Sequence, residues 1–252
     1  AASLQYGTQF GGLINFKLKE PKPDDKFELT TRNTIGSNNL YTNFTSISSS
    51  NDNLGYYGYV NYKIGDGFRQ NSDFESINTF QSLNLKLTDR SKLTSEITYL
   101  EYLAHQAGGL SDRMFEIDPY QSNRERNWFQ VKWLLYNLKY LYEISPDSNF
   151  SFSFFGLDAT RNALGFRTNR VDQIDFGEER DLIKGRFRNF GFETRYINNY
   201  TVLNKKSYLL LGAKYYNSFS ESTQGPGSAS KDANFNFDYL NFPNYVNQSE
   251  YS

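Results

Sequence analysis

Apolar and polar residues alternate with a period of two along most of this chain. Between 150 and 154, phenylalanines alternate with Ser151 and Ser153, and between 83 and 88, leucines alternate with Asn84, Lys86 and Thr88. Successive side chains of a β-strand point to opposite faces of a sheet, so the pattern indicates strands with one apolar and one polar face. No stretch keeps a helical period for long, and β-branched and aromatic residues dominate. The pattern predicts an all-β fold.

The alternating segments define about nine strands, joined by connections of two kinds. We predict strands at 26–36, 40–49, 54–64, 76–88, 92–104, 128–144, 150–163, 185–202 and 207–219. Short polar turns lie at Asn51–Asn53, Asp89–Ser91, Pro146–Ser148 and Asn204–Lys206, and another short connection lies at Gly36–Asn39. Long connections cover 65–75, 105–127, 164–184 and the residues from 220 onward. Tight turns at one rim and long loops at the other are typical of a transmembrane antiparallel β-barrel.

Composition agrees with a membrane barrel. Aromatic residues make up 17% of the 252 residues, yet the mean hydropathy is -0.69. Barrel strands give no strong hydropathy signal because their lipid-facing and lumen-facing residues alternate. No apolar run approaches the roughly 20 residues of a membrane-spanning helix. The net charge of -1 provides no overall field that favours nucleic acid, so we expect no nucleic-acid partner.

The residue types that carry most enzyme chemistry are scarce. The chain has no cysteine, which excludes disulfides, thiolate metal sites and Cys nucleophiles. Its single histidine, His105, excludes multi-histidine metal sites and argues against a catalytic triad. Glu178, Glu179 and Asp181 adjoin Arg180 and are best explained as a solvated charged surface. We therefore predict that the protein is not an enzyme and has no metal site of its own.

Arginines are concentrated in and beside the long connections. They are Arg69, Arg113, Arg124, Arg126, Arg161, Arg167, Arg170 and Arg180. Guanidinium groups match carboxylates bidentately, so several on one rim suit a small polyanion. Each one could equally pair with a nearby Asp or Glu, and the sequence leaves both interpretations open.

Two features concern domain organisation. Residues 20–25 form a Pro-rich, charged segment that predicts a hinge, and it is the best internal boundary in the chain. The first residues contain no initiator Met and no signal-peptide pattern, and the last ones are polar, so we expect an internal piece of a longer protein.

Two motifs resemble one known family. Near the N-terminus, Tyr6-Gly7 and Gly11-Gly12-Leu13-Ile14-Asn15 precede a short strand. In the longest internal loop, Gly108-Gly109-Leu110-Ser111-Asp112 is followed by Phe115, Asp118-Pro119 and the segment from Ser122 to Trp128-Phe129. These segments are similar to the TonB-dependent outer-membrane receptors, of the ferric citrate type. The residues that mark the motifs are Gly7, Gly11, Gly12, Asn15, Gly108, Gly109 and Trp128.

The resemblance implies both an architecture and a function. Residues 1–20 would be the end of a plug domain, 21–25 a hinge, and 26–252 the first part of a plugged barrel of about 22 strands in the bacterial outer membrane. Such a receptor is surrounded by outer-membrane lipid and imports ferric dicitrate, driven by the TonB-ExbB-ExbD complex. Citrate keeps the iron chelated, so no cofactor is implied. By analogy, Arg113, Arg124 and Arg126 would bind the anionic complex.

Two alternatives remain open from the sequence. The first keeps the transporter class but changes the cargo to another siderophore or an oligosaccharide, which the many loop tyrosines could stack against. The second is a soluble β-sandwich binding module, which predicts shorter strands, tight turns at both ends and a second packed sheet.

Overall fold

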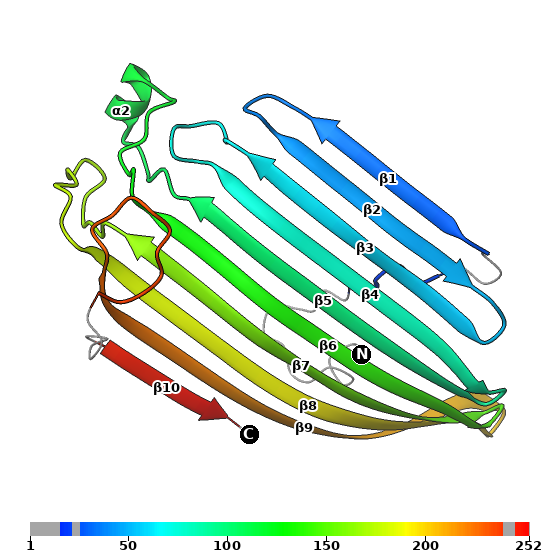
Figure 1. The fold of residues 1–252 in the computed structure, drawn as a ribbon. Helices are drawn as coiled ribbons and strands as arrows, with labels where there is room; N and C mark the ends of the chain where they lie inside the picture. Colours follow the sequence, from blue (N-terminus) through cyan, green and yellow to red (C-terminus); the bar gives the residue numbers. More distant parts are fainter. Residues whose placement is uncertain (1–15, 22–25, 239–244, 252) are drawn as a thin grey trace.

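The computed structural model describes residues 16–21, 26–238 and 245–251, which form one long antiparallel sheet (Figure 1). Its strands are β1 (Glu28–Ile35), β2 (Tyr41–Ser50), β3 (Leu54–Gly65), β4 (Phe74–Thr88), β5 (Ser91–His105), β6 (Trp128–Ser145), β7 (Ser148–Gly165), β8 (Arg180–Val202), β9 (Lys205–Gly227) and β10 (Tyr245–Tyr251). A six-residue helix, α2 (Asp112–Ile117), lies in the loop between β5 and β6. In the part of the chain described, no helix is long and apolar enough to cross a membrane.

Each strand pairs with its neighbours in the sequence, in the order β1 to β10. All the pairs are antiparallel, and β1 and β10 form the two edges of the described sheet. The described strands form a single sheet without a second sheet packed on it, so the β-sandwich alternative is wrong. The all-β, antiparallel prediction is confirmed.

The nine predicted strands are all present, with three differences. A tenth strand, β10, pairs with β9 where we expected only loop. Both β8 and β9 are longer than predicted and contain 23 residues each. The end of β9, Gly225-Pro226-Gly227, has the composition of a turn, but it pairs in register with Arg180, Asp181 and Leu182 of β8. Cross-strand pairing therefore overrides the local turn preference.

The two rims of the sheet differ as predicted. At one rim, Thr88 and Ser91 hydroxyls lie 2.7 Å apart across a turn, and Ser145 and Ser148 repeat this arrangement at the same distance. At the turn between β8 and β9, Leu203 and Asn204 both have positive φ, as two-residue hairpin turns require. The long connections gather at the opposite rim (Figure 1).

The two faces of the sheet have different surroundings. On the inner face, Lys19 lies over the ring of Tyr57, 5.1 Å from its centroid, and Pro21 packs against Gly55. Lys19 and Pro21 therefore lie against this face. Gly7, Gly11, Gly12, Asn15 and most of the 21–25 hinge lie outside the described residues, so the division into plug end, hinge and barrel stays a prediction.

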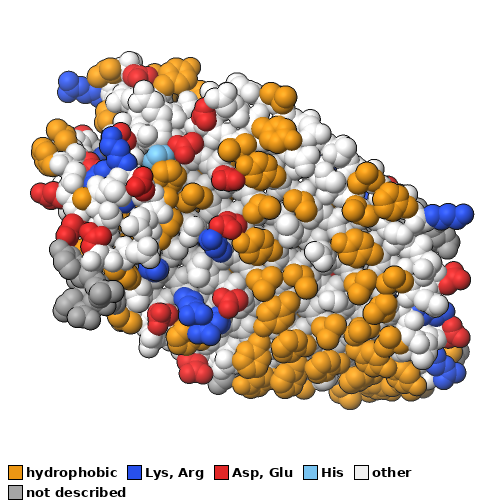
Figure 2. Space-filling model, viewed as in Figure 1, with side chains coloured by type: hydrophobic (Ala, Val, Ile, Leu, Met, Phe, Trp, Pro, Cys, Tyr) orange, Lys and Arg blue, Asp and Glu red, His pale blue; other side chains and the backbone are white. Residues whose placement is uncertain are grey.

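The outer face carries an apolar band (Figure 2). We define the band by residues that the register places side by side on β6 to β9, in two rows: Tyr136, Gly156, Phe190 and Asn217, then Leu138, Phe154, Phe192 and Tyr215. Leu138, Phe154 and Phe192 are large apolar side chains, and all three are exposed. An exposed band of large apolar side chains is what a lipid-facing surface requires.

Toward the long loops the apolar band gives way to polar residues. The register aligns Glu101, Lys132, Thr160, Arg186, Glu221 and Gln248 across β5 to β10, and we call this set the polar row. Lys132 and Glu101 form an ion pair at 2.5 Å. Strands of 23 residues are about 75 Å long at about 3.3 Å per residue, far more than an apolar band about 25 Å tall can cover. The strands therefore continue beyond the band, and on the loop side β8 extends from Phe190 to Arg180.

Candidate ligand-binding loops

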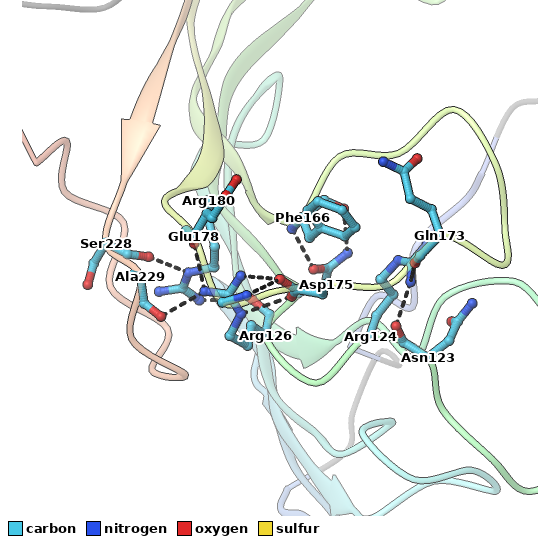
Figure 3. A network of polar contacts seen from close by, with 12 residues as sticks. Asn123, Arg124, Arg126, Phe166, Gln173, Asp175, Glu178, Arg180, Ser228 and Ala229 are labelled. Atoms are coloured by element: carbon cyan, nitrogen blue, oxygen red, sulfur yellow. Dashed lines mark hydrogen bonds and ion pairs between the residues drawn. The ribbon is translucent and has the colours of Figure 1, made fainter.

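Three loops that are far apart in the sequence meet at the long-loop rim. They are 106–127, 166–179 and 228–238, and hydrogen bonds from buried arginines connect them (Figure 3). The first of these loops fills the 105–127 connection expected from the sequence, and its arginines contact both of the other loops.

Arg126 is the centre of this connection. Its Nε donates to Asp175 Oδ2 at 2.9 Å, and its Nη2 makes a further, very short contact with Asp175 Oδ1. Its Nη1 donates to the carbonyl oxygens of Glu178 at 2.9 Å and Ala229 at 2.7 Å. The side chain is only 6% exposed. One guanidinium therefore joins loops 106–127, 166–179 and 228–238.

Asp175 is the carboxylate that compensates this buried charge. Burial by itself would raise the pKa of Asp175, but the hydrogen bonds from Arg126 and from the Gly177 N–H bring the pKa below its ordinary value. Asp175 is therefore ionised at neutral pH and holds the Arg126 guanidinium in place.

Arg180, at the start of β8, is the most deeply buried arginine, at 1% exposure. Its Nη1 donates to the backbone oxygen of Arg126 at 2.8 Å, and its Nε donates to that of Ser228 at 2.6 Å. Burial, and next the charge of Arg126, lower the pKa of its guanidinium from the ordinary value. The sequence predicted a solvated charged surface around Arg180, and this prediction is wrong for Arg180, whose buried guanidinium connects two loops.

Arg124 connects loop 106–127 to one other loop, 166–179. Its Nη1 donates to the Gln173 carbonyl at 3.1 Å, and its Nη2 donates to Thr168 Oγ1 at 3.1 Å and the Val171 carbonyl at 3.2 Å. The guanidinium also lies 5.4 Å from the ring centroid of Phe166. Like Arg126, this side chain is buried.

The remaining predicted site residue, Arg113, is separated from the other two. It lies exposed on α2, and within the described residues it forms no ion pair. Arg69 ties the β3–β4 loop to the same region, because its Nη1 donates to the Gly108 carbonyl at 2.7 Å and its Nε to the Gln121 carbonyl at 2.9 Å. The structure thus brings Arg124 and Arg126 together and leaves Arg113 free at the tip.

The motif residues of this loop have structural roles. Gly108 has a φ of +77°, and an added Cβ would lie 2.4 Å from Asn123 Oδ1, so the turn requires glycine here. Gly109 has no such constraint, since its nearest neighbour would be 3.7 Å away. Trp128 begins β6 and stacks on His105, with ring centroids 3.6 Å apart. His105 in turn contacts Asp73 Oδ1 through Nδ1 at 2.7 Å.

The other arginines of the long loops are more exposed. Arg167 pairs with Asp181 at 3.1 Å and Arg170 with Asp172 at 3.8 Å, as expected of surface ion pairs. Arg161 lies exposed on the inner face of β7, two positions from Ala159 and in register with Val131. No cluster of side chains that could hold a metal ion occurs among the described residues.

Comparisons with known proteins rest on the fold. The sequence matches no protein-family model and no curated protein. Among solved structures, the fold is similar to the unliganded ferric citrate transporter FecA, with a TM-score of 0.67 and 17% identity over 81% of this chain and 30% of that one. It is also similar to the pyoverdine outer membrane receptor FpvA from Pseudomonas aeruginosa, with a TM-score of 0.71 and 11% identity over 91% of this chain and 37% of that one. The siderophore receptor PiuA from Acinetobacter baumannii has a TM-score of 0.69 and 11% identity over 82% of this chain and 32% of its own.

These comparisons define the class of fold. The chain has the fold of a portion of the barrel wall of outer-membrane receptors, and it spans about a third of the length of these three structures. At such low sequence identity, the likeness shows the fold alone. The function of the protein has to be argued from its own surfaces.

Proposed function

We propose that this chain is part of a TonB-dependent outer-membrane receptor that imports a ferric chelate, with ferric dicitrate as the leading cargo. The observation that carries the proposal is the outer face, where an exposed apolar band ends at the polar row on the side of the long loops. This surface suits a wall embedded in lipid with its loops outside the membrane. The protein is then a transporter rather than an enzyme.

The similar solved structures support the choice of cargo class. FecA is a ferric citrate transporter, FpvA binds pyoverdine and PiuA is a siderophore receptor. Ferric dicitrate is a small polyanion, and an exposed guanidinium such as that of Arg113 suits its carboxylates. Iron stays chelated by citrate, so the protein needs no metal ligand or cofactor of its own.

In this proposal the predicted site residues act in two ways. Arg113 is exposed and can contact an anion directly. Arg124 and Arg126 donate to loop carbonyls and to Asp175, so they act on a ligand chiefly by fixing the loops around it. We also propose that the TonB-ExbB-ExbD complex supplies the energy, through a part of the receptor outside this sequence.

Uptake of radioactive iron tests the proposal. The intact receptor is expressed in a strain that lacks its own ferric citrate receptor, with and without a functional TonB. We expect TonB-dependent uptake of ferric citrate, reduced several-fold by Arg113→Ala and by the double change of Arg124 and Arg126 to Ala. Arg90→Ala, at the opposite rim, is the matched control.

Each outcome of the uptake experiment bears on a different part of the proposal. Uptake that does not depend on TonB would remove the energy source proposed here. Unchanged uptake in all the loop variants would refute the assignment of the site. No uptake of any ferric chelate would refute the function itself.

Another siderophore is the second candidate cargo. The pyoverdine receptor FpvA covers more of this chain than FecA does, 91% against 81%. Growth of the same strain on ferric citrate and on pyoverdine-type siderophores as sole iron sources separates the two cargoes.

A further inference from the structure

His105, the last residue of β5, lies beside the end of the β3–β4 connection and the end of loop 106–127. Its Nδ1 lies 2.7 Å from Asp73 Oδ1, and its Nε2 lies 3.0 Å from the backbone oxygen of Glu125. Its ring stacks on that of Trp128 with an interplanar angle of 21°. The side chain is 13% exposed, so protein groups rather than water surround most of the imidazole.

Both hydrogen-bonding partners of this imidazole are acceptors. A carboxylate and a backbone carbonyl have no proton to donate, and a neutral imidazole has only one N–H. With that proton on Nδ1, a lone pair of Nε2 faces the Glu125 carbonyl; with it on Nε2, a lone pair of Nδ1 faces Asp73. Only the imidazolium donates to both, and its charge also suits the face of the Trp128 indole. The contacts of His105 are therefore those of the protonated ring.

The charged groups that face His105 come from three segments. Asp73 precedes β4, and Glu75 follows two residues later on the same face of the sheet. In loop 106–127, the Glu125 carboxylate pairs with Lys231 of loop 228–238 at 2.5 Å. Asp73 is thus the carboxylate in contact with the ring, and its charge favours the imidazolium.

The contacts of the stacked rings also reach a second long loop. Trp128 donates from Nε1 to the Lys231 carbonyl at 2.7 Å, and Lys231 is the residue that pairs with Glu125. The end of loop 106–127 and the middle of loop 228–238 are therefore fixed against the same pair of rings.

We propose that His105 is a pH-sensitive latch for these two loops. Histidine ordinarily gains or loses its proton between about pH 5 and 8. The protonated ring holds the Glu125 end of loop 106–127 against Asp73. After the proton is lost, one of the two contacts sets an acceptor against an acceptor, and the loop end is released. Loop order is then high in mildly acidic medium and falls as the pH rises. The consequence for uptake rests on the proposed function, whereas loop order does not.

Hydrogen exchange of the intact receptor in micelles tests the latch. Protection factors, which correct for the intrinsic pH dependence of exchange, are compared at about pH 5.5 and about pH 8.5, on either side of the histidine range. We expect protection in 106–127 and 228–238 to fall on the order of tenfold as the pH rises, as loss of one charge-assisted hydrogen bond would give. Loop 166–179, which Arg124 and Arg126 hold instead, should show no change over this range.

Three variants separate the latch from a general effect of pH. His105→Gln has no proton to lose at this position and should remove the pH dependence of loop protection. Asp73→Asn should move the change in protection to lower pH, because the carboxylate that favours the imidazolium is gone. Arg90→Ala, at the opposite rim, is the matched control and should keep the pH dependence of the unchanged receptor.

Two exchange results would overturn the latch: equal protection at the two pH values in the unchanged receptor, or full pH dependence in His105→Gln. Heat-modifiable gel mobility verifies that each variant is folded. An independent measurement follows the ring of His105 by NMR of carbon-13-labelled histidine in the unchanged receptor, with the signal assigned by its shift in Asp73→Asn. Its titration must coincide with the loss of loop protection, and clearly separate midpoints would also overturn the latch.

Uptake of ferric chelate at the same two pH values separates this inference from the proposed function. If loop order follows pH as expected but no chelate is imported, the proposed function fails and the latch stands. If chelate is imported and loop protection is independent of pH, only the latch falls.

Discussion

Removing Arg126 should release the loops without unfolding the sheet. The side chains of Arg126 and Asp175 are 6% and 13% exposed, so this is a buried ion pair. Breaking such a pair by removing one partner costs about 3–5 kcal/mol. Because Asp175 can turn toward solvent or take up a proton, the low end of about 3 kcal/mol applies. Every tie formed by Arg126 is to a loop, so the cost falls on loop order.

Hydrogen exchange in the intact receptor measures this cost. A loss of about 3 kcal/mol in loop stability corresponds to roughly a hundredfold faster amide exchange. We expect this faster exchange for the amides of 166–179 and 228–238 in Arg126→Ala. Strands β2 to β5 should exchange as before. Arg167→Ala is the matched control, since Arg167 pairs with Asp181 but is 66% exposed, and such surface pairs contribute about 0–1 kcal/mol. If Arg126→Ala changes loop exchange no more than Arg167→Ala, the central role of Arg126 is refuted.

Three further predictions follow from the same structure. The pKa of Asp175 is depressed, so the ionised carboxylate stabilises the folded loops above the ordinary Asp pKa of about 3.9, and this stabilisation is lost as pH falls through the lower folded pKa. Hydrogen exchange in 166–179 should therefore accelerate only below about pH 4. Asp175→Asn should abolish that pH dependence. Gly108→Ala should destabilise the loop by more than about 1 kcal/mol in thermal unfolding, whereas Gly109→Ala should not. Phe154→Arg, in the apolar band, should lower the folding free energy of the intact receptor in bilayers by about 2–4 kcal/mol. Gln130→Arg, beyond the polar row, should lower it by only about 0–1 kcal/mol. Equal losses of folding free energy would place the membrane elsewhere.

The sequence was informative about the fold because side-chain alternation and turn chemistry are local. Most strands from β1 to β9 contain a period-two pattern, although Leu134-Leu135 interrupts it in β6 and Leu209-Leu210-Leu211 in β9. The turns before Ser91 and Ser148 contain their own capping hydroxyls. Strand ends were less predictable. The last residues of β9 form strand only because β8 supplies hydrogen-bonding partners, and a single sequence does not reveal a partner. The same reason explains why β10 was missed.

The arginines show why site prediction from sequence is harder. Arg124 and Arg126 have the residue type and spacing of anion ligands, and the sequence left open whether they pair internally. Their acceptors include the Gln173 and Ala229 carbonyls, which are 49 and 103 residues away, and backbone oxygens leave no signature in a sequence.

The burial of these guanidinium groups has a consequence for binding. A buried guanidinium must keep its N–H groups satisfied, so a polyanion could bind Arg126 directly only by displacing Asp175 or the loop carbonyls. Exposed Arg113, and Arg161 on the inner face, require no such exchange. A ligand that enters from the loop side should therefore contact Arg113 and Arg161 rather than the buried guanidinium groups of Arg124, Arg126 and Arg180.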